Sequence, residues 1–202
     1  SYLIEGGASR SFRHTKTLML SDPGGWNALM EYLTGVLADY INGQIAAGVQ
    51  AIQVFDSWVG CLSPSDYRRF VFPHMRALFR AISPGTPVIH FGTGTGLLLE
   101  AMREAGGSAI GVDHRVELDD AWRRLGPGVG IQGNLDPVAL CTNLGVIRER
   151  VTGILNQAQG RSGHIFNLGH GVLPETPVEH AAALVKLVHE ESARIREKTS
   201  SG

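Results

Sequence analysis

Apolar residues recur at steps of three and four positions after Asp22-Pro23, in the first quarter of the chain. They are Trp26, Leu29, Met30, Leu33, Val36, Leu37, Tyr40 and Ile41. This spacing gathers apolar side chains on one side of a helix and leaves the other side polar. An Asp-Pro pair is typical of a helix start, because Asp can cap the helix and Pro fits its first turn. The pattern therefore predicts an amphipathic helix that begins near Pro23.

Five short apolar runs follow, each bounded by glycine or polar residues. They are Ala51–Phe55, Pro87–Phe91, Ala109–Val112, Val129–Gln132 and His164–Asn167. A helical pattern follows each run. One predicted helix extends from Ser63-Pro64 to about Ile82, another opens at Asp136-Pro137, and the last extends from Thr176-Pro177 to about Arg196. A strand followed by a helix, five times over, predicts parallel strands joined by right-handed crossovers, which is the α/β class.

Composition narrows the class of protein. The chain has 202 residues, of which 43% are hydrophobic, and a formal net charge of -1. We expect a soluble globular chain with one sizeable core and no general attraction to nucleic acid. No membrane span is expected, because no apolar run approaches the ~20 residues that a span requires. Cys61 and Cys141 form no paired motif, which favours a reducing compartment and predicts a cytoplasmic protein.

Polar residues fall just past the carboxyl end of each predicted strand. They are Asp56, Ser57, His90, Asp113, His114, Asn134, Asp136, Asn167 and His170. Parallel α/β folds place their sites at these ends, in open sheets and in barrels alike. His170 stands between Gly169 and Gly171, which would let a ligand approach the main chain. The alternative is that these positions are ordinary solvated turns and helix caps.

One glycine-rich turn offers a competing function. Gly92 to Gly96 follows a strand, and Asp113 ends the next strand, which resembles the cofactor motif of S-adenosylmethionine-dependent methyltransferases. That motif commonly has an acidic residue before its first glycine, where this chain has His90-Phe91. A complete strand unit that ends in Phe55 also precedes what should be the first strand. This methyltransferase interpretation remains an alternative, as does a non-catalytic domain that only binds or dimerises.

Four sequence blocks match another family in order and at plausible distances. They are Tyr2–Gly7, Gln53–Gly60, Gln132–Pro137 and Asn167–Gly171, and through them the chain resembles the uroporphyrinogen decarboxylase family from Tyr2 to about Arg196. The resemblance implies a (β/α)₈ TIM barrel and a homodimer. Residues 1–202 would be the carboxyl-terminal part of this single barrel domain, with about five of its units. It implies a lyase of tetrapyrrole (heme) biosynthesis that needs no metal or organic cofactor. Its substrate would be uroporphyrinogen III, which loses four acetate carboxyl groups to give coproporphyrinogen III.

The resemblance also implies roles for four residues. Tyr2 matches the family's catalytic tyrosine, which hydrogen-bonds near the reacting acetate, and Ser57 matches a serine that contacts a substrate carboxylate. Phe55 matches an aromatic residue beside the macrocycle, and His170 matches a histidine that meets a substrate carboxylate. Each has a simpler alternative. Tyr2 could be a frayed terminus, Ser57 a helix cap, Phe55 a buried strand residue and His170 a solvated turn.

Part of the family pattern is missing from this chain. The family's essential aspartate and its carboxylate-binding arginines match nothing here and would lie before Ser1, so we expect the chain to be a carboxyl-terminal portion that is inactive alone. The strand ends offer mainly His90, His114, Arg115 and His170 as cations, whereas a polycarboxylate needs a cationic pocket, so further cations must come from elsewhere.

Zinc-dependent relatives carry a cysteine two residues after the histidine at position 90, where this chain has Gly92, and no metal site is expected.

Overall fold

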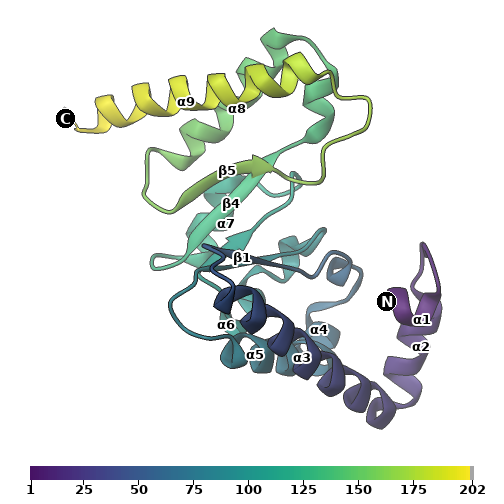
Figure 1. The fold of residues 1–202 in the computed structure, drawn as a ribbon. Helices are drawn as coiled ribbons and strands as arrows, with labels where there is room; N and C mark the ends of the chain where they lie inside the picture. The colour runs from purple at the N-terminus through teal and green to yellow at the C-terminus, as the bar shows by residue number, and fades with distance from the viewer. Residues whose placement is uncertain (201–202) are drawn as a thin grey trace. The chain divides into compact units, whose positions relative to one another are not determined.

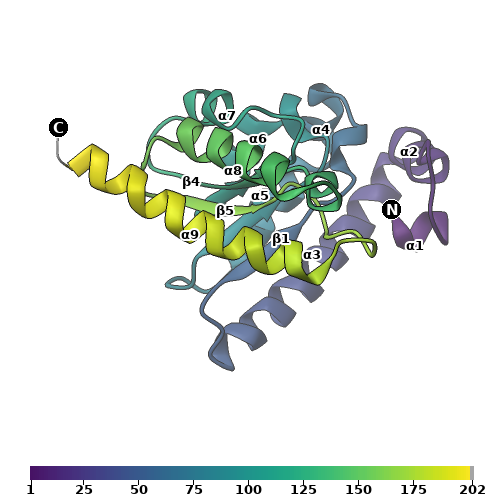
Figure 2. The same cartoon turned by 90° about the horizontal axis from the view of Figure 1, so that it is seen from above.

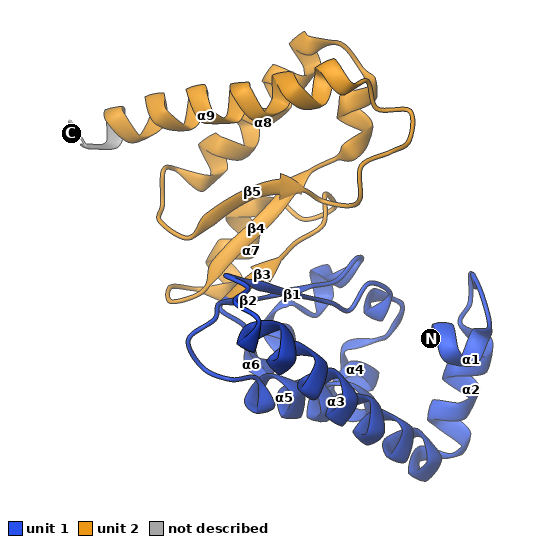
Figure 3. Ribbon diagram, in the orientation of Figure 1, with its two compact units in different colours: residues 1–108 blue, residues 109–202 orange. Residues whose placement is uncertain are grey.

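The computed structural model describes residues 1–200, with side chains through residue 197. The segment 1–202, predicted to be the carboxyl-terminal part of a single barrel domain, therefore includes two residues that lie outside the described range. The chain forms two compact units, residues 1–108 and 109–202, coloured separately in Figure 3.

The first unit contains three helices ahead of its strands. In chain order its elements are α1 (Tyr2–Glu5), α2 (Arg13–Ser21), α3 (Pro23–Ala46), β1 (Ile52–Phe55), η1 (Val59–Cys61), α4 (Pro64–Phe70), α5 (Phe72–Ala81), β2 (Val88–Phe91), η2 (Thr95–Leu97) and α6 (Leu99–Ala105), where η marks a 3-10 helix (Figure 1). β1 and β2 pair in parallel, with Ile52 opposite Val88 and Phe55 opposite Phe91. Both strands therefore end at the same edge, and the loops after them are neighbours.

The second unit repeats the strand–helix order. Its elements are β3 (Ala109–Gly111), α7 (Leu118–Leu125), β4 (Gly130–Leu135), η3 (Pro137–Cys141), α8 (Leu144–Ala158), β5 (His164–Leu168) and α9 (Val178–Ser200). β4 pairs in parallel with β3 and with β5, and Leu135 stands opposite Leu168. α9 lies beside α8, as Figure 2 shows from above.

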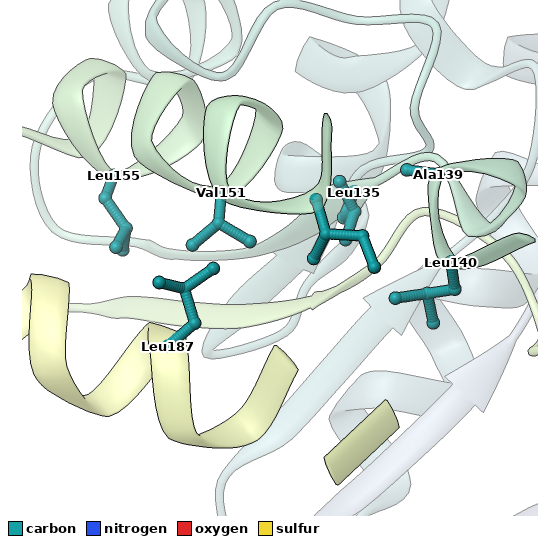
Figure 4. Packing of buried hydrophobic residues seen from close by; sticks show 7 residues of the cluster. Leu135, Ala139, Leu140, Val151, Leu155 and Leu187 are labelled. Carbon is teal, nitrogen blue, oxygen red and sulfur yellow. The ribbon is translucent and has the colours of Figure 1, made fainter. Parts of the chain in front are cut away.

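A hydrophobic cluster joins α8 and α9 to the sheet of the second unit. Leu187 of α9 is 7% exposed and points toward Val151 and Leu155 of α8 (Figure 4). Leu135 and Leu140, each 1% exposed, extend the same cluster to the end of β4 and to η3. Burial of such side chains is the main favourable term in folding, at roughly 1.5–3 kcal/mol for each. Packing of Leu135 into this cluster fixes the end of β4.

The predicted α/β class is confirmed. Five strands alternate with helices, and each described strand pair is parallel. The predicted helix at Pro23 is α3, whose start is capped by Asp22 through a 2.9 Å hydrogen bond from the Gly25 amide. Within the described residues, no helix combines the length and the apolar character needed to cross a membrane.

Two predicted helices differ from the structure. The segment from Ser63 to Ile82 is two helices, α4 and α5, because Pro73 has no amide hydrogen to continue the ladder and the chain breaks at Val71. Asp136 caps only the short 3-10 helix η3, through a 3.0 Å hydrogen bond from the Val138 amide. The α-helix of this unit begins later, where the Asn143 side chain accepts from the Val146 amide.

The ends of the chain also differ from prediction. The last helix was predicted from Thr176-Pro177, but α9 begins at Val178, and the Thr176 hydroxyl has no hydrogen-bond partner among the described atoms. At the other end, α1 and α2 were not predicted. They are tied together because Glu5 Oε1 accepts a 2.8 Å hydrogen bond from the Thr15 amide, and this bond lowers the pKa of Glu5.

Candidate functional site

A cavity of about 570 Å³ opens in the first unit, among α1, α2, α3 and the loop after β1. It contains three of the four residues predicted for the site, Tyr2, Phe55 and Ser57. Much of the remaining wall is aromatic or aliphatic: Phe12, Met19, Trp26, Met30, Trp58, Val59, Leu62 and Val71. The arrangement suits a large, partly apolar ligand that carries polar groups.

Two aromatic residues present their rings at this cavity. Phe55 is the last residue of β1 and is 66% exposed, with its ring edge-on to Phe91 at 5.9 Å between centroids. The alternative of a buried strand residue was therefore wrong. Tyr2 is 61% exposed and belongs to α1, and its ring lies 5.0 Å from the ring of Trp58. This contact holds Tyr2 against the loop after β1.

Close backbone packing fixes the loop that carries Ser57. The Ser57 carbonyl accepts a 3.2 Å hydrogen bond from the Thr93 amide and a second bond from the Thr93 hydroxyl. A side chain at Gly60 would fall on the backbone of Thr93 and Gly94. η1 begins after Trp58 without a side-chain cap, so the alternative of Ser57 as a helix cap was wrong. The half-buried Ser57 side chain instead lines the cavity.

One cation and one carboxylate border the same cavity. Lys16 of α2 is half-buried, and its Nζ donates a 2.8 Å hydrogen bond to the carbonyl oxygen of Cys61. The carboxylate is Asp56, whose Oδ2 lies 3.9 Å from Nε2 of His90. Burial raises the pKa of the Cys61 thiol, and the charge of Lys16 partly opposes that rise. Sequence reasoning missed Lys16 because it did not recognise α2.

His90 cannot serve as an exposed cation at the strand ends. Its side chain is fully buried, and its ring packs 4.9 Å from the ring of Phe79. Arg115 is likewise engaged, because its guanidinium and its amide both donate to the Asp113 carboxylate. Of the four cations named from the sequence, His90 is thus buried, and Arg115, although its side chain is 65% exposed, is paired with the carboxylate of Asp113.

His170 follows β5 in the second unit, and its side chain is exposed. Its Nδ1 accepts a 2.8 Å hydrogen bond from the Gly171 amide. With Nδ1 taken up by this bond, Nε2 is the ring nitrogen left to donate to a ligand. The preceding residue, Gly169, donates a 2.7 Å hydrogen bond to the Leu135 carbonyl and packs on the backbone of Asp113 and His114. His170 therefore offers an N–H donor from a fixed loop.

Two other strand-end residues of this unit hold loops in place. Asp113 is 2% exposed, and its carboxylate accepts from Arg115. The buried Asn134 amide donates to the carbonyls of Asp113 and Val116 at 3.0 and 2.5 Å. These hydrogen bonds within the protein satisfy both buried side chains, so no ligand is needed to explain why polar residues stand at these positions.

Packing also accounts for the glycine-rich turn. A side chain at Gly92 would come within 2.7 Å of the Thr95 methyl and 2.9 Å of the Asp56 carbonyl. Gly94 adopts the left-handed conformation, with φ 68°, at the start of η2. These two glycines are required by the loop itself, so they do not indicate a cofactor.

Metal binding finds no support in the described side chains, where no three His, Cys, Asp or Glu residues are grouped to hold an ion. Cys61 and Cys141 are both free and exposed. The expectation of a metal-free and cofactor-free protein stays a prediction.

Parallel strands that alternate with helices, with polar loops and a cavity where strands end, are features of the α/β barrel class of fold. The model of the family described as "Uroporphyrinogen decarboxylase (URO-D)" matches residues 1–191. A uroporphyrinogen decarboxylase of Sorangium cellulosum is 55% identical over 190 residues, which are 94% of this chain and 54% of that protein. One of Thermus thermophilus is 53% identical over 194 residues, covering 96% and 57%.

The chain belongs to the uroporphyrinogen decarboxylase family. It spans about half the length of the curated relatives that it matches. The solved structure of a methyltransferase from Methanosarcina mazei is similar with a TM-score of 0.69, over 78% of this chain and 47% of that protein. Its 20% identity shows a shared fold and nothing of function. The α/β fold of (β/α)₈ type, with about five strand–helix units in this chain, is confirmed.

Proposed function

We propose that this chain is part of a uroporphyrinogen decarboxylase, which converts uroporphyrinogen III to coproporphyrinogen III in heme biosynthesis. The observation that carries the proposal is the cavity that unites Tyr2, Phe55 and Ser57, in a chain that belongs to this family. We further propose a cytoplasmic homodimer that works without metal or organic cofactor.

The proposed reaction depends on proton transfers to the substrate. Protonation of a pyrrole ring creates an electron sink, the carbon–carboxylate bond breaks, and its electron pair flows into the ring as carbon dioxide leaves. Protonation of the remaining methylene carbon gives a methyl group, and the ring then releases the proton it took up, so each acetate consumes one proton overall. A site for this reaction must bind many carboxylates and place a donor beside the reacting one.

The proposed roles follow the positions of the side chains. Phe55 would pack beside the macrocycle with its exposed ring, and the Tyr2 hydroxyl would hydrogen-bond near the reacting acetate. Ser57, on a loop fixed by Thr93, would contact a second carboxylate. His170 would donate from Nε2 to a carboxylate side chain of the substrate, because Nδ1 is occupied by the Gly171 amide.

Binding measurements test this proposal against the methyltransferase alternative. Calorimetry on the native protein that contains these residues should show heat with a uroporphyrin and none with S-adenosylhomocysteine. Phe55→Ala should weaken porphyrin binding, because it removes an exposed ring. Gly35→Ala is a matched control, because nothing lies within 4 Å of its added methyl group. Binding of S-adenosylhomocysteine alone would refute the proposal.

A further inference from the structure

Lys16 is the one lysine or arginine among the described residues that line the cavity containing Tyr2 and Ser57. The family resemblance assigned it no role, because the predicted cations all lay at strand ends. It belongs instead to α2, a helix of nine residues (Arg13–Ser21) that precedes the first strand. Its position supplies a positive charge to a cavity proposed to receive a polycarboxylate.

The ammonium group is oriented by the protein. Nζ donates to the Cys61 carbonyl at 2.8 Å, and Cys61 ends η1 in the loop that also carries Ser57. An ammonium has three N–H donors, so this bond leaves two for other acceptors. The nearby carboxylate, Asp56, directs Oδ2 toward His90 at 3.9 Å. Lys16 is therefore held at the wall of the cavity by a neutral acceptor.

We propose, on the basis of the proposed function, that Lys16 binds a substrate carboxylate that is retained in the reaction. The reacting carboxylate loses its negative charge as carbon dioxide forms, so a cation bound to it would stabilise the ground state more than the transition state. A cation on a retained carboxylate stabilises both states equally, which lowers KM and leaves kcat unchanged. Lys16 thus serves binding and orientation of the polycarboxylate.

Three variants of the native enzyme test this assignment with uroporphyrinogen III under anaerobic conditions. Lys16→Gln keeps a donor for the Cys61 carbonyl and removes the charge, so KM should rise about tenfold with kcat within about twofold, as for the loss of one hydrogen bond to a charged group. Lys16→Arg keeps the charge and should stay within about threefold of the wild-type KM. Lys186→Gln is the control, since Lys186 of α9 is exposed and pairs with Glu190 at 3.9 Å.

The salt dependence provides a readout that a structural role would not affect. Wild-type KM should rise with ionic strength more steeply than that of Lys16→Gln, because the variant lacks one charge pair with the substrate. An unchanged KM in Lys16→Gln would overturn the proposal. The proposal would also be overturned if Lys16→Gln lowered the Tm but kept a wild-type KM at temperatures below that Tm. Failure of the variant to fold would overturn it as well. A wild-type enzyme without turnover would instead overturn the proposed function.

Discussion

Gly169 and Gly171 flank His170 and offer a matched pair of substitutions. A methyl group at Gly169 would fall on the His114 amide nitrogen and within 2.9 Å of the Asp113 carbonyl carbon and His114 Cα. These atoms are backbone and cannot rotate away. A methyl group at Gly171 would meet nothing within 4 Å, and neither glycine has a positive φ.

The magnitude follows from the contact distances. Ordinary carbon contacts are roughly 3.5–4.0 Å, so Gly169→Ala must push the loop after β5 away from the loop after β3 by roughly 1 Å. This movement would stretch the 2.7 Å hydrogen bond from the Gly169 amide to Leu135 and displace His170. Overpacking of this kind costs about 1–3 kcal/mol. Gly171→Ala should change stability by less than about 1 kcal/mol, and can raise it by restricting the unfolded chain.

Urea unfolding and steady-state kinetics on the native enzyme provide the assay. Gly169→Ala should lower the free energy of unfolding by about 1–3 kcal/mol and raise KM, whereas Gly171→Ala should do neither. Equal stability and equal KM for the two variants would refute the conclusion that backbone contact at Gly169 positions His170.

Further predictions concern the core, the pH dependence and the site. Leu187→Ala should lower the free energy of unfolding in urea by about 2–5 kcal/mol, because it leaves a cavity beside Val151 and Leu155. Val185→Ala is the control, and because the Val185 side chain is 57% exposed it should lower that free energy by less than about 0.5 kcal/mol. Burial lowers the pKa of His164 in the folded state. Below the ordinary pKa of about 6.5, the unfolded state therefore binds more protons than the folded state, and the free energy of unfolding falls as the pH falls. His164→Gln should make the free energy of unfolding fall less steeply between about pH 7 and 5. The same pH dependence in the variant and the wild type would contradict the conclusion that burial lowers the pKa of His164. His170→Asn should reduce kcat/KM without abolishing turnover, because the residue binds a carboxylate; complete loss in a folded variant would assign it a larger role.

Strand positions could be predicted because they depend on local patterns. Apolar runs between glycines placed four strands within one residue of their observed ends, and the Asp22-Pro23 signal placed the start of α3. β4 proved longer, since Gly133 and Asn134 continue the pairing with β5 as far as Leu135. A glycine and an asparagine carry no strand signal, so only tertiary pairing reveals them.

The site was predictable only in part. The motif residues Tyr2, Phe55 and Ser57 do line one cavity, but residues of α1 and α2 also form its wall. Those helices are short, and α2 is held by tertiary contacts such as the burial of Met19 at 1% exposure. Lys16 became visible as a site residue only once α2 was placed. The burial of His90 likewise depends on α5, through Phe79.

Turnover by the native protein is the decisive test of the proposed decarboxylase activity. Anaerobic incubation with uroporphyrinogen III, without added metal or S-adenosylmethionine, should yield coproporphyrinogen III and four molecules of carbon dioxide for each substrate molecule. Tyr2→Phe should slow this conversion while the protein remains folded. Recovery of unchanged uroporphyrinogen III from the wild-type protein would contradict the account.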